Sequence, residues 1–371
     1  MKPIWTLAIS TLFLFWYADR YDSSVSIRIG RIRISRQFIY WSAVAAIILV
    51  SGLRSNVGDT AIYMINFTRI IPWDFSTLRR SEPGFELFQL LIKSLIHPHS
   101  QALIIITSLI TMLALFYAIY RWSPSYFISG FLFFTTSYYM TIINGVNQGM
   151  VAALHMLLIP LILKRKFLIY SLIVLALSTL HSSALILIPI FIAVSSRRWR
   201  FFSLMLAILA LVIIFFPAVF TAFIPFLERT QYAVYASIDL SGIEGANPLR
   251  TAVSFIPVFL GVLYRKRSSK NIAFYDLCLK MAILNSLFLV MGHANWIFVR
   301  MNFYFMPFVL LLLPMVFMEG MKPRERAVIM GVMIVLYSVL FWYEYKNVIF
   351  VSKFLNINGH HPTYMEQIIY K

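Results

Sequence analysis

Carboxylates and arginines gather in the polar stretches between long apolar segments of this chain. Arg54 and Asp59 stand five residues apart in GLRSNVGD, and Glu82 follows in the same polar stretch. A carboxylate can take the proton of a hydroxyl group or stabilise a cationic transition state. It can also simply neutralise a neighbouring arginine, and such a partner lowers its pKa and weakens it as a base. Asp59 and Glu82 are therefore candidates for catalysis, with charge neutralisation as the competing explanation.

Three arginines stand at the predicted outer ends of apolar segments: Arg54, Arg250 and Arg300. The planar guanidinium group binds phosphate through parallel hydrogen bonds and keeps its charge at physiological pH. The three side chains therefore suit a diphosphate held at a membrane surface. Arginines at helix ends also reach toward lipid headgroups, so convergence on one pocket is the observation that separates the two roles.

One histidine and three side-chain amides complete the set of candidates. His181 opens the motif HSS at the end of an apolar segment, where a pKa near the working pH would let it accept a proton. A purely structural histidine is an equally weighted alternative. Asn144, Asn147 and Gln148, in NGVNQ, supply uncharged hydrogen-bond donors at a predicted helix turn.

Composition predicts the elements that must position these residues. Sixty per cent of the 371 residues are apolar and 12% are charged, which excludes an ordinary soluble globule. The apolar stretches are about 15 to 22 residues long, the length of a helix that crosses a bilayer, and they lack the alternation of a β-barrel strand. The sequence predicts an all-α polytopic membrane bundle in a single domain, residues 1–371. About twelve spans are expected, near residues 3–17, 37–53, 100–120, 125–142, 148–163, 167–180, 184–196, 201–223, 249–264, 272–291, 301–318 and 327–345.

Basic residues between the spans predict the orientation. More than half of the 32 Lys and Arg residues lie in loops of one parity, and Arg197, Arg198 and Arg200 form one such group. The positive-inside rule makes these loops cytoplasmic, and an even number of crossings leaves both termini outside. Three non-cytoplasmic segments are polar enough to build a site: 54–99, 224–248 and 292–300. Within the first, FELFQLLIKSLI is too short to span and is expected along the interface or as a re-entrant segment.

Several chemistries are disfavoured by what the sequence lacks. Cys278 is the single cysteine, so no disulfide framework or cysteine metal site is expected. No phosphate-binding loop, dinucleotide fingerprint or zinc motif is present. No Asp, Glu or His residues are spaced like a metal site, so we expect no metal and no cofactor. The basic residues form short clusters between apolar segments and no continuous stripe, which argues against a nucleic-acid partner.

Four stretches together resemble the EpsG family of Wzy-like exopolysaccharide polymerases. They are GLRSNVGDTAIY (52–63) with SEPGFELF (81–88), NGVNQGMVAAL (144–154), LSTLHSSALILIP (177–189) and RMNFYFMPFVLLLLP (300–314). Arg54, Asp59, Tyr63, the Glu82-Pro83-Gly84 element and His181 correspond to the family's motif positions. Asn147 stands where an arginine is usual, so one expected cation is missing, and the phosphate clamp is expected to centre on Arg250 or Arg300.

The resemblance implies a membrane glycosyltransferase acting on undecaprenyl-diphosphate-linked oligosaccharide. It implies a multi-pass protein of the bacterial inner membrane, with an active site that faces the periplasm or exterior. The expected partners are this lipid-linked substrate, membrane lipid, and a chain-length regulator and flippase of the same pathway. Asp59, His181 and Glu82 would be catalytic, and Arg54, Arg250, Arg300, Asn144, Asn147 and Gln148 would bind the substrate and its diphosphate.

Two other functions remain open at the level of sequence. A flippase or secondary transporter of lipid-linked saccharides would need charged groups near the bilayer midplane and often has internal repeats, and the sequence shows little of either. An O-antigen-type ligase shares the lipid-diphosphate chemistry, and composition does not separate it from a polymerase.

Overall fold

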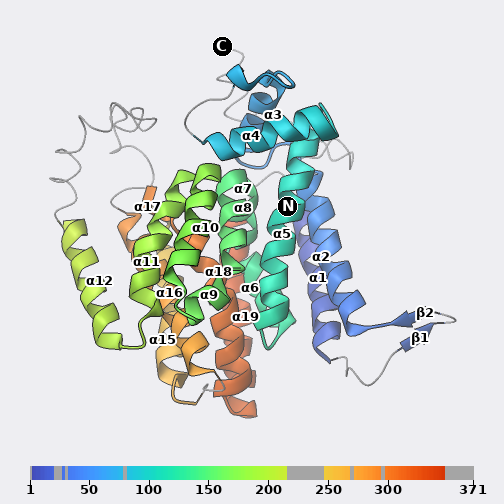
Figure 1. Cartoon of the computed structure of the whole chain (residues 1–371). Helices are drawn as coiled ribbons and strands as arrows, with labels where there is room; N and C mark the ends of the chain where they lie inside the picture. Colours follow the sequence, from blue (N-terminus) through green and yellow to red (C-terminus); the bar gives the residue numbers. More distant parts are fainter. Residues whose placement is uncertain are drawn as a thin grey trace.

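The computed structural model describes residues 2–20, 27–29, 32–77, 82–214, 246–267, 271–293 and 297–346. Over these residues the fold is helical, as predicted, apart from one short antiparallel pair, in which Ile27 lies opposite Ile34 (Figure 1). The all-α prediction is confirmed with that exception. Most of the predicted site segment 224–248, up to residue 245, lies outside the described residues.

The first half of the chain contains α-helices of very different lengths, short 3₁₀- and π-helical segments and one pair of short strands. They are α1 (Lys2–Arg20), β1 (Ile27–Ile29), β2 (Ile32–Ile34), α2 (Arg36–Gly52), α3 (Thr60–Arg69), η1 (Phe75–Thr77), α4 (Pro83–Leu91), η2 (Ile92–Ile96), α5 (Gln101–Trp122), α6 (Tyr126–Thr135), α7 (Tyr138–Asn144), α8 (Val146–Met156) and α9 (Ile159–Leu163). The second half continues with α10 (Phe167–Leu180), η3 (Ser182–Ile186), α11 (Leu187–Ser195), α12 (Trp199–Ile214), α15 (Pro248–Tyr264), α16 (Ile272–Met291), α17 (Ile297–Arg300), α18 (Asn302–Met315), η5 (Val316–Gly320) and α19 (Pro323–Tyr345).

Each of the twelve predicted apolar stretches falls, at least in part, on a helix or a broken helix. Four helical segments of the described chain have the length and hydropathy of a membrane span: Gln101–Trp122, Ile272–Met291, Asn302–Gly320 and Pro323–Glu344. A fifth is possible if α6 and α7, which meet at 64°, form one broken span. The chain is thus a helical membrane protein, but the count of twelve spans is not confirmed. The stretch 125–142, predicted as one continuous span, is broken, because Ser137 adopts a left-handed conformation (φ 69°) and ends α6 there.

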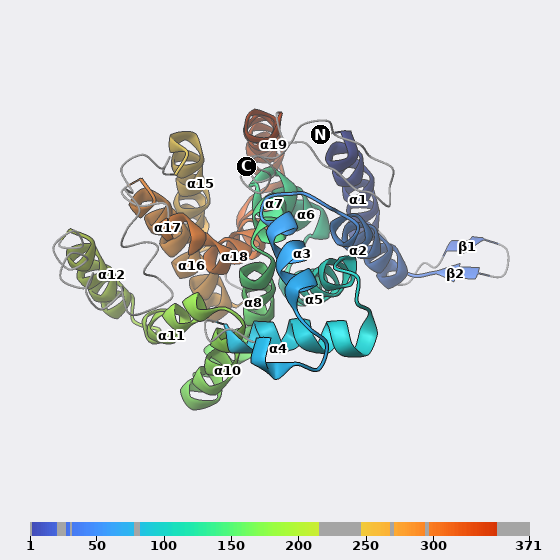
Figure 2. The ribbon, with the colours of Figure 1, turned by 90° about the horizontal axis from the view of Figure 1, so that it is seen from above.

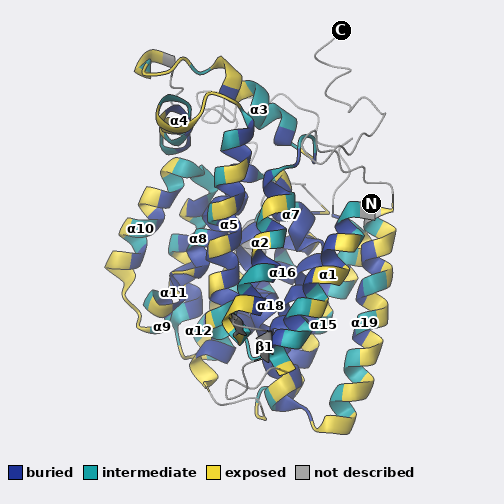
Figure 3. Cartoon of the chain, turned by 90° about the vertical axis from the view of Figure 1, so that its right-hand side faces the viewer, coloured by how far each residue is buried: buried dark blue, intermediate teal, exposed yellow. Residues whose placement is uncertain are grey.

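Helix α18 forms the centre of the bundle (Figure 2). It packs against α16, α6, α8 and α15, and Phe305, Leu311 and Leu313 are fully buried. Helix α19 lies at the edge instead, with Val328, Val335 and Val339 more than half exposed (Figure 3). Exposed apolar residues on a peripheral helix of this composition are what contact with lipid requires.

A carboxylate from the first helix fixes the start of α6. Asp19 accepts hydrogen bonds from the Ser125 hydroxyl (2.6 Å) and from the backbone N–H groups of Tyr126 (2.8 Å) and Phe127 (2.9 Å). These N–H groups have no partner within the helix, and a negative charge is favourable at a helix N-terminus. The contact anchors the N-terminus of α6 to the end of α1.

The two ends of the bundle differ in character (Figure 1). Helices α3 and α4 lie across one end, whereas the β1–β2 pair and the α15–α16 connection lie at the other. At that second end Arg265 forms a bidentate pair with Asp276, at 2.7 and 2.8 Å. Lys280, 1% exposed, donates to the carbonyl groups of Val194 and Ser196 near the end of α11. The charges nearest the spans are therefore satisfied by local structural contacts.

Candidate functional site

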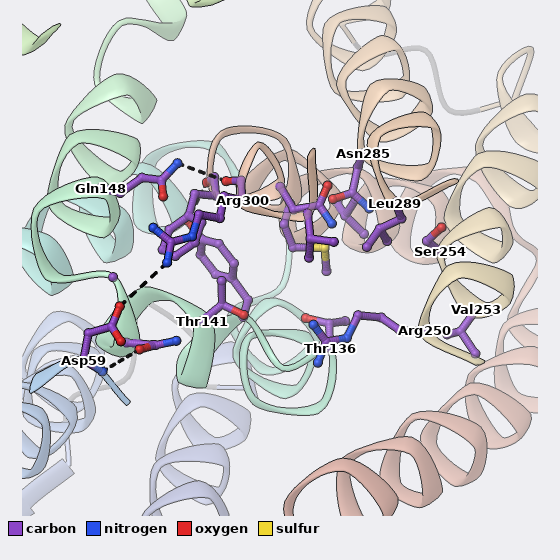
Figure 4. A pocket seen from close by; sticks show the side chains of 18 of the residues that line it. Asp59, Thr136, Thr141, Gln148, Arg250, Val253, Ser254, Asn285, Leu289 and Arg300 are labelled. Carbon is purple, nitrogen blue, oxygen red and sulfur yellow. Dashed lines mark hydrogen bonds and ion pairs between the residues drawn. The ribbon is translucent and has the colours of Figure 1, made fainter. Parts of the chain in front are cut away.

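A cavity of about 400 Å³ opens beneath α3, between α7, α8, α15, α16, α18 and α19. Its lining contains eight of the nine site residues nominated from sequence: Asp59, Glu82, His181, Arg250, Arg300, Asn144, Asn147 and Gln148. Figure 4 shows Asp59, Gln148 and Arg300 at one side of this space and Asn285, Leu289 and Arg250 at the other. Residues from distant parts of the chain thus converge on one pocket.

Gly58 allows the loop that carries Asp59 to pack closely against the end of α7. Gly58 has a left-handed backbone (φ 55°), and a Cβ atom there would lie 2.0 Å from Asn144 Oδ1. The close approach permits a hydrogen bond, in which the backbone N–H of Asp59 donates to Asn144 Oδ1 at 2.7 Å. Only glycine combines this conformation with so close an approach. Asn144 therefore positions Asp59 at the rim of the cavity.

Glu82 and His181 meet where α4 crosses α10. Gly84 allows the approach, because a Cβ atom at this position would lie 2.2 Å from the Thr179 hydroxyl. Glu82 Oε1 lies 2.5 Å from His181 Nδ1, and Glu82 Oε2 accepts a hydrogen bond from the Asn147 amide, also at 2.5 Å. Both oxygens of the carboxylate are engaged, so Glu82 is held in one orientation toward the imidazole ring.

The contact with Glu82 decides which ring nitrogen of His181 carries the proton. A carboxylate accepts hydrogen bonds, so Nδ1 is the protonated nitrogen and Nε2 keeps its lone pair in the neutral ring. Among the described residues Nε2 has no hydrogen-bond partner. The His181 side chain is 18% exposed. This arrangement suits a proton acceptor that is oriented by a carboxylate behind it.

Tyr63 completes the group around Asn147. Its hydroxyl donates to Asn147 Oδ1 at 2.6 Å. Burial raises the pKa of Tyr63, and the nearby charges of Glu82 and Asp59 raise it further, so the phenol stays protonated and remains a donor. The Asn147 amide is thereby fixed with its nitrogen toward Glu82. At the position where the family resemblance leads us to expect an arginine, this chain uses an amide to orient the carboxylate.

Arg300 faces Asp59 across the mouth of the cavity. Its Nη2 atom lies 3.9 Å from Asp59 Oδ2, and the two side chains are 44% and 39% exposed. Burial raises the pKa of Asp59, and the positive charge of Arg300 opposes that rise. Gln148 donates to the Arg300 carbonyl at 3.0 Å and to the Ser183 hydroxyl at 3.2 Å. Gln148 therefore links the end of α17 to the segment that carries His181.

Arg250 is paired at the opposite side of the cavity. Its Nε atom lies 2.7 Å from Glu344 Oε1, and the Glu344 side chain is 4% exposed. The Ser137 hydroxyl, at the α6–α7 break, donates to the other oxygen of Glu344. The pair joins α15 to α19. Sequence analysis did not nominate Glu344, although an acidic residue inside the apolar stretch 327–345 is the signal that would have identified it.

Arg54 is the one nominated residue that lies outside the cavity lining. It is 2% exposed and donates to four neutral oxygens: the Ser51 carbonyl, Ser108 Oγ (2.9 Å), the Ile143 carbonyl (2.7 Å) and Thr60 Oγ1 (3.0 Å). Burial lowers the pKa of Arg54 to about 10, so the side chain is still charged at neutral pH. Its donors are used to join α2, α3, α5 and α7. The predicted role of Arg54 in binding diphosphate therefore has no support from its position.

Among the described residues, no group of three or more His, Cys, Asp or Glu side chains lies close enough together to hold a metal ion. The polar residues of the lining that were not nominated from the sequence include Asn285, Asn302 and Tyr337. Each stands inside or at the start of an apolar helix. A polar side chain within a predicted span is the signal that could have revealed them.

Comparison with known proteins agrees with this picture of the chain. No curated protein and no solved structure matches it. A family profile, that of the EpsG family, matches residues 38–357. This region contains every residue of the cavity and almost all of the described helices. The chain belongs to the EpsG family, a family of Wzy-like exopolysaccharide polymerases.

Proposed function

We propose that this protein transfers a growing glycan from undecaprenyl diphosphate to a hydroxyl group of another lipid-linked repeat unit. The observation that carries the proposal is the pairing, in one cavity, of a carboxylate-oriented histidine with an arginine. His181 is held by Glu82 at 2.5 Å, and Arg300 lies beside Asp59 at the mouth. The first group suits deprotonation of an acceptor, and the second suits a departing phosphate.

The proposed reaction forms one carbon–oxygen bond and breaks another. The acceptor oxygen attacks the anomeric carbon of the donor sugar while its proton passes to His181 Nε2. The bond between that carbon and the diphosphate oxygen breaks, and its electron pair leaves with undecaprenyl diphosphate. Arg300 stabilises the negative charge on the leaving group. Because diphosphate leaves as an anion, the reaction needs a cation there more than it needs a general acid.

Glu82 and Asp59 serve as positioning residues in this scheme. Glu82 fixes the ring tautomer of His181 and stabilises the imidazolium that forms when the proton is taken up. Asp59 orients the guanidinium group of Arg300, and Asn147 and Tyr63 hold Glu82 in place. The sequence left the roles of base and positioning carboxylate open between Asp59, Glu82 and His181, and the contacts of Glu82 with His181 and of Asp59 with Arg300 support this division of roles.

We further propose that the cavity faces the non-cytoplasmic side of the bacterial inner membrane. The support is that α3 and α4, which carry the outward-facing motifs, lie at the end opposite the basic α15–α16 connection (Figure 1). The positive-inside rule assigns the basic end to the cytoplasm. The outward placement of both termini and the twelve spans belong to the same proposal.

Deleting the protein and analysing the glycans of the cell tests the proposed function against its rivals. A polymerase predicts that surface glycans shrink to single repeat units. Loss of a ligase would instead leave polymer unattached, and loss of a flippase would accumulate lipid-linked repeats on the cytoplasmic side. Either of those two outcomes would refute the proposal. Complementation with the wild-type chain and with His181→Ala separates loss of the protein from loss of its chemistry.

A further inference from the structure

The cavity extends beyond the histidine and Arg300 into a second part, which we name the inner limb. It is lined by Ser254 and Pro257 of α15, Asn285 and Leu289 of α16, and Tyr337 and Leu340 of α19. Asn285 lies six residues before the end of α16 at Met291, which places it roughly 9 Å along the helix from that end. The inner limb is therefore inside the bundle and is not part of its surface loops.

Two polar side chains of the inner limb, Asn285 and Tyr337, have polar atoms without a hydrogen-bond partner among the described residues. Asn285 is 1% exposed, and its Oδ1 atom accepts no hydrogen bond from any described residue. Tyr337 is 2% exposed, and no hydrogen bond of its hydroxyl occurs within the described part of the chain. Asn302, at the start of α18 in the same lining, also has a buried Oδ1 without a partner. Buried polar atoms are rarely left in this state, since each loses its hydrogen bonds to water.

We infer that the inner limb binds a sugar ring of the lipid-linked substrate, an inference that rests on the proposed function. Sugar hydroxyls can donate to Asn285 Oδ1 and can exchange a hydrogen bond with the Tyr337 hydroxyl. Asn302 Oδ1, elsewhere in the lining of the same cavity, offers a further acceptor. Pro257, Leu289 and Leu340 supply apolar surface for the C–H face of a pyranose ring.

A polyprenyl chain is the competing occupant, because the limb is partly apolar and lies between the helices of the bundle. Such a chain has no hydrogen-bond donor, so it would leave the amide of Asn285 and the hydroxyl of Tyr337 as they are. A saccharide satisfies both the polar atoms and the apolar wall. The inner limb thus takes the glycan, and the sugar bound there lies in the same cavity as His181 and Arg300.

Protection of an introduced thiol distinguishes the two occupants. The only native cysteine, Cys278, is fully buried, so Asn285→Cys supplies a new reactive position over a low background. The purified variant in lipid nanodiscs is treated with a small thiol reagent in the presence of one of two probes. The first probe is the repeat-unit oligosaccharide, released from its carrier by mild acid, and the second is undecaprenyl phosphate, which carries no sugar.

We expect the oligosaccharide to slow labelling of Asn285→Cys and undecaprenyl phosphate to leave its rate unchanged. Equal or stronger protection by undecaprenyl phosphate would overturn the inference. Labelling that neither probe slows, or a thiol that never reacts in a folded variant, would overturn it as well. This labelling experiment needs no turnover, so it tests sugar binding alone. The proposed polymerase function is tested separately, by the glycan profile of the deletion strain.

A matched pair of variants extends the test to affinity. Tyr337→Phe removes one hydroxyl and is expected to raise the KM for the lipid-linked repeat roughly five- to tenfold, the value of one buried hydrogen bond. Gln89→Leu is the control, because Gln89 is also buried with an unpartnered Oε1 but lies outside the cavity lining. An unchanged KM in Tyr337→Phe, or an equal rise in Gln89→Leu, would contradict a sugar-binding role.

Discussion

Arg54 and Arg300 are the same residue type at predicted outer helix ends, yet the structure places them in opposite surroundings. Arg54 is 2% exposed and donates to four neutral oxygens from four segments. Arg300 is 44% exposed and faces the single carboxylate of Asp59 at 3.9 Å. One guanidinium group has its donors used by the fold, and the other presents its charge to a cavity. The difference shows that an arginine at a predicted helix end can either join helices or face a cavity where substrate could bind. The residues around it in the folded protein determine which of the two it does.

Of the two arginines, Arg54 should have the larger effect when it is replaced. The replacement should lower the free energy of unfolding. In Arg54→Leu, four buried acceptors lose their donor at a cost of about 1–3 kcal/mol each, so we expect destabilisation of roughly 3 kcal/mol or more. Thermal unfolding of the detergent-solubilised protein measures it. Arg69→Leu is the control, because Arg69 is an exposed arginine at the end of α3. A stable but inactive Arg54→Leu protein would make Arg54 a ligand after all.

Replacing Arg300 should act on the reaction and leave the fold intact. Arg300→Ala is expected to lower kcat by about 10²- to 10³-fold, the usual cost of removing a group that stabilises developing charge. Initial rates with purified lipid-linked repeat measure the effect, and the melting temperature should stay close to that of the wild type. Arg300→Lys keeps the charge without the planar fork and should fall between the two. Normal turnover in Arg300→Ala would remove the leaving-group role.

Replacing Asp59 should lower kcat/KM by a smaller factor, and that factor should depend on pH. Burial raises its pKa while Arg300 opposes the rise, and only the ionised form orients the guanidinium group. We expect wild-type kcat/KM to exceed that of Asp59→Asn by about tenfold or less at high pH, the loss of one charge-assisted contact. The ratio should fall toward one as pH drops through the pKa of Asp59, because protonation then makes the wild type resemble the variant. A ratio that stays flat across the pH range would contradict this role.

Replacing Arg250 or Glu344 should have the smallest effect on turnover, because these two residues pair with each other. Single variants Arg250→Met and Glu344→Gln are expected to weaken substrate affinity modestly by loosening α15 from α19. In a double-mutant cycle the coupling should be on the order of 1 kcal/mol. Melting temperatures and KM values of the two single variants and the double variant supply the cycle. Additive effects would show that the 2.7 Å contact is energetically unimportant.

The sequence predicted the helical class and named eight of the residues that line the cavity, and the reasons are physical. Apolar length marks a helical segment, so each of the twelve predicted stretches falls at least in part on a helix, whereas four or five of the described segments have the length and hydropathy of a membrane span. Short motifs also named Asp59, Glu82, Asn147 and His181, whose side chains meet in the cavity. Local pattern cannot report tertiary burial, however. The four partners of Arg54 come from different segments, one of them 89 residues away.

The helix break at Ser137 and the role of Glu344 escaped sequence analysis for a related reason. Ser137 adopts a left-handed conformation that its residue type does not require. Its hydroxyl then reaches Glu344, which is 207 residues away. Contacts at such separation leave no periodic pattern in the sequence. The same holds for Asn285 and Tyr337, because only the folded arrangement of the described residues shows that their polar atoms have no hydrogen-bond partner there.

Chemical rescue of His181→Ala tests the central claim most directly. Loss of a general base should reduce turnover of purified lipid-linked repeat by about 10²- to 10⁴-fold, with the melting temperature nearly unchanged. Added imidazole should restore part of the rate, and more of it as rising pH increases the neutral form of the added base. The account predicts that rescue, with no rescue in Arg300→Ala. Wild-type turnover in His181→Ala, or a loss that imidazole never restores at any pH, would contradict His181 as the base.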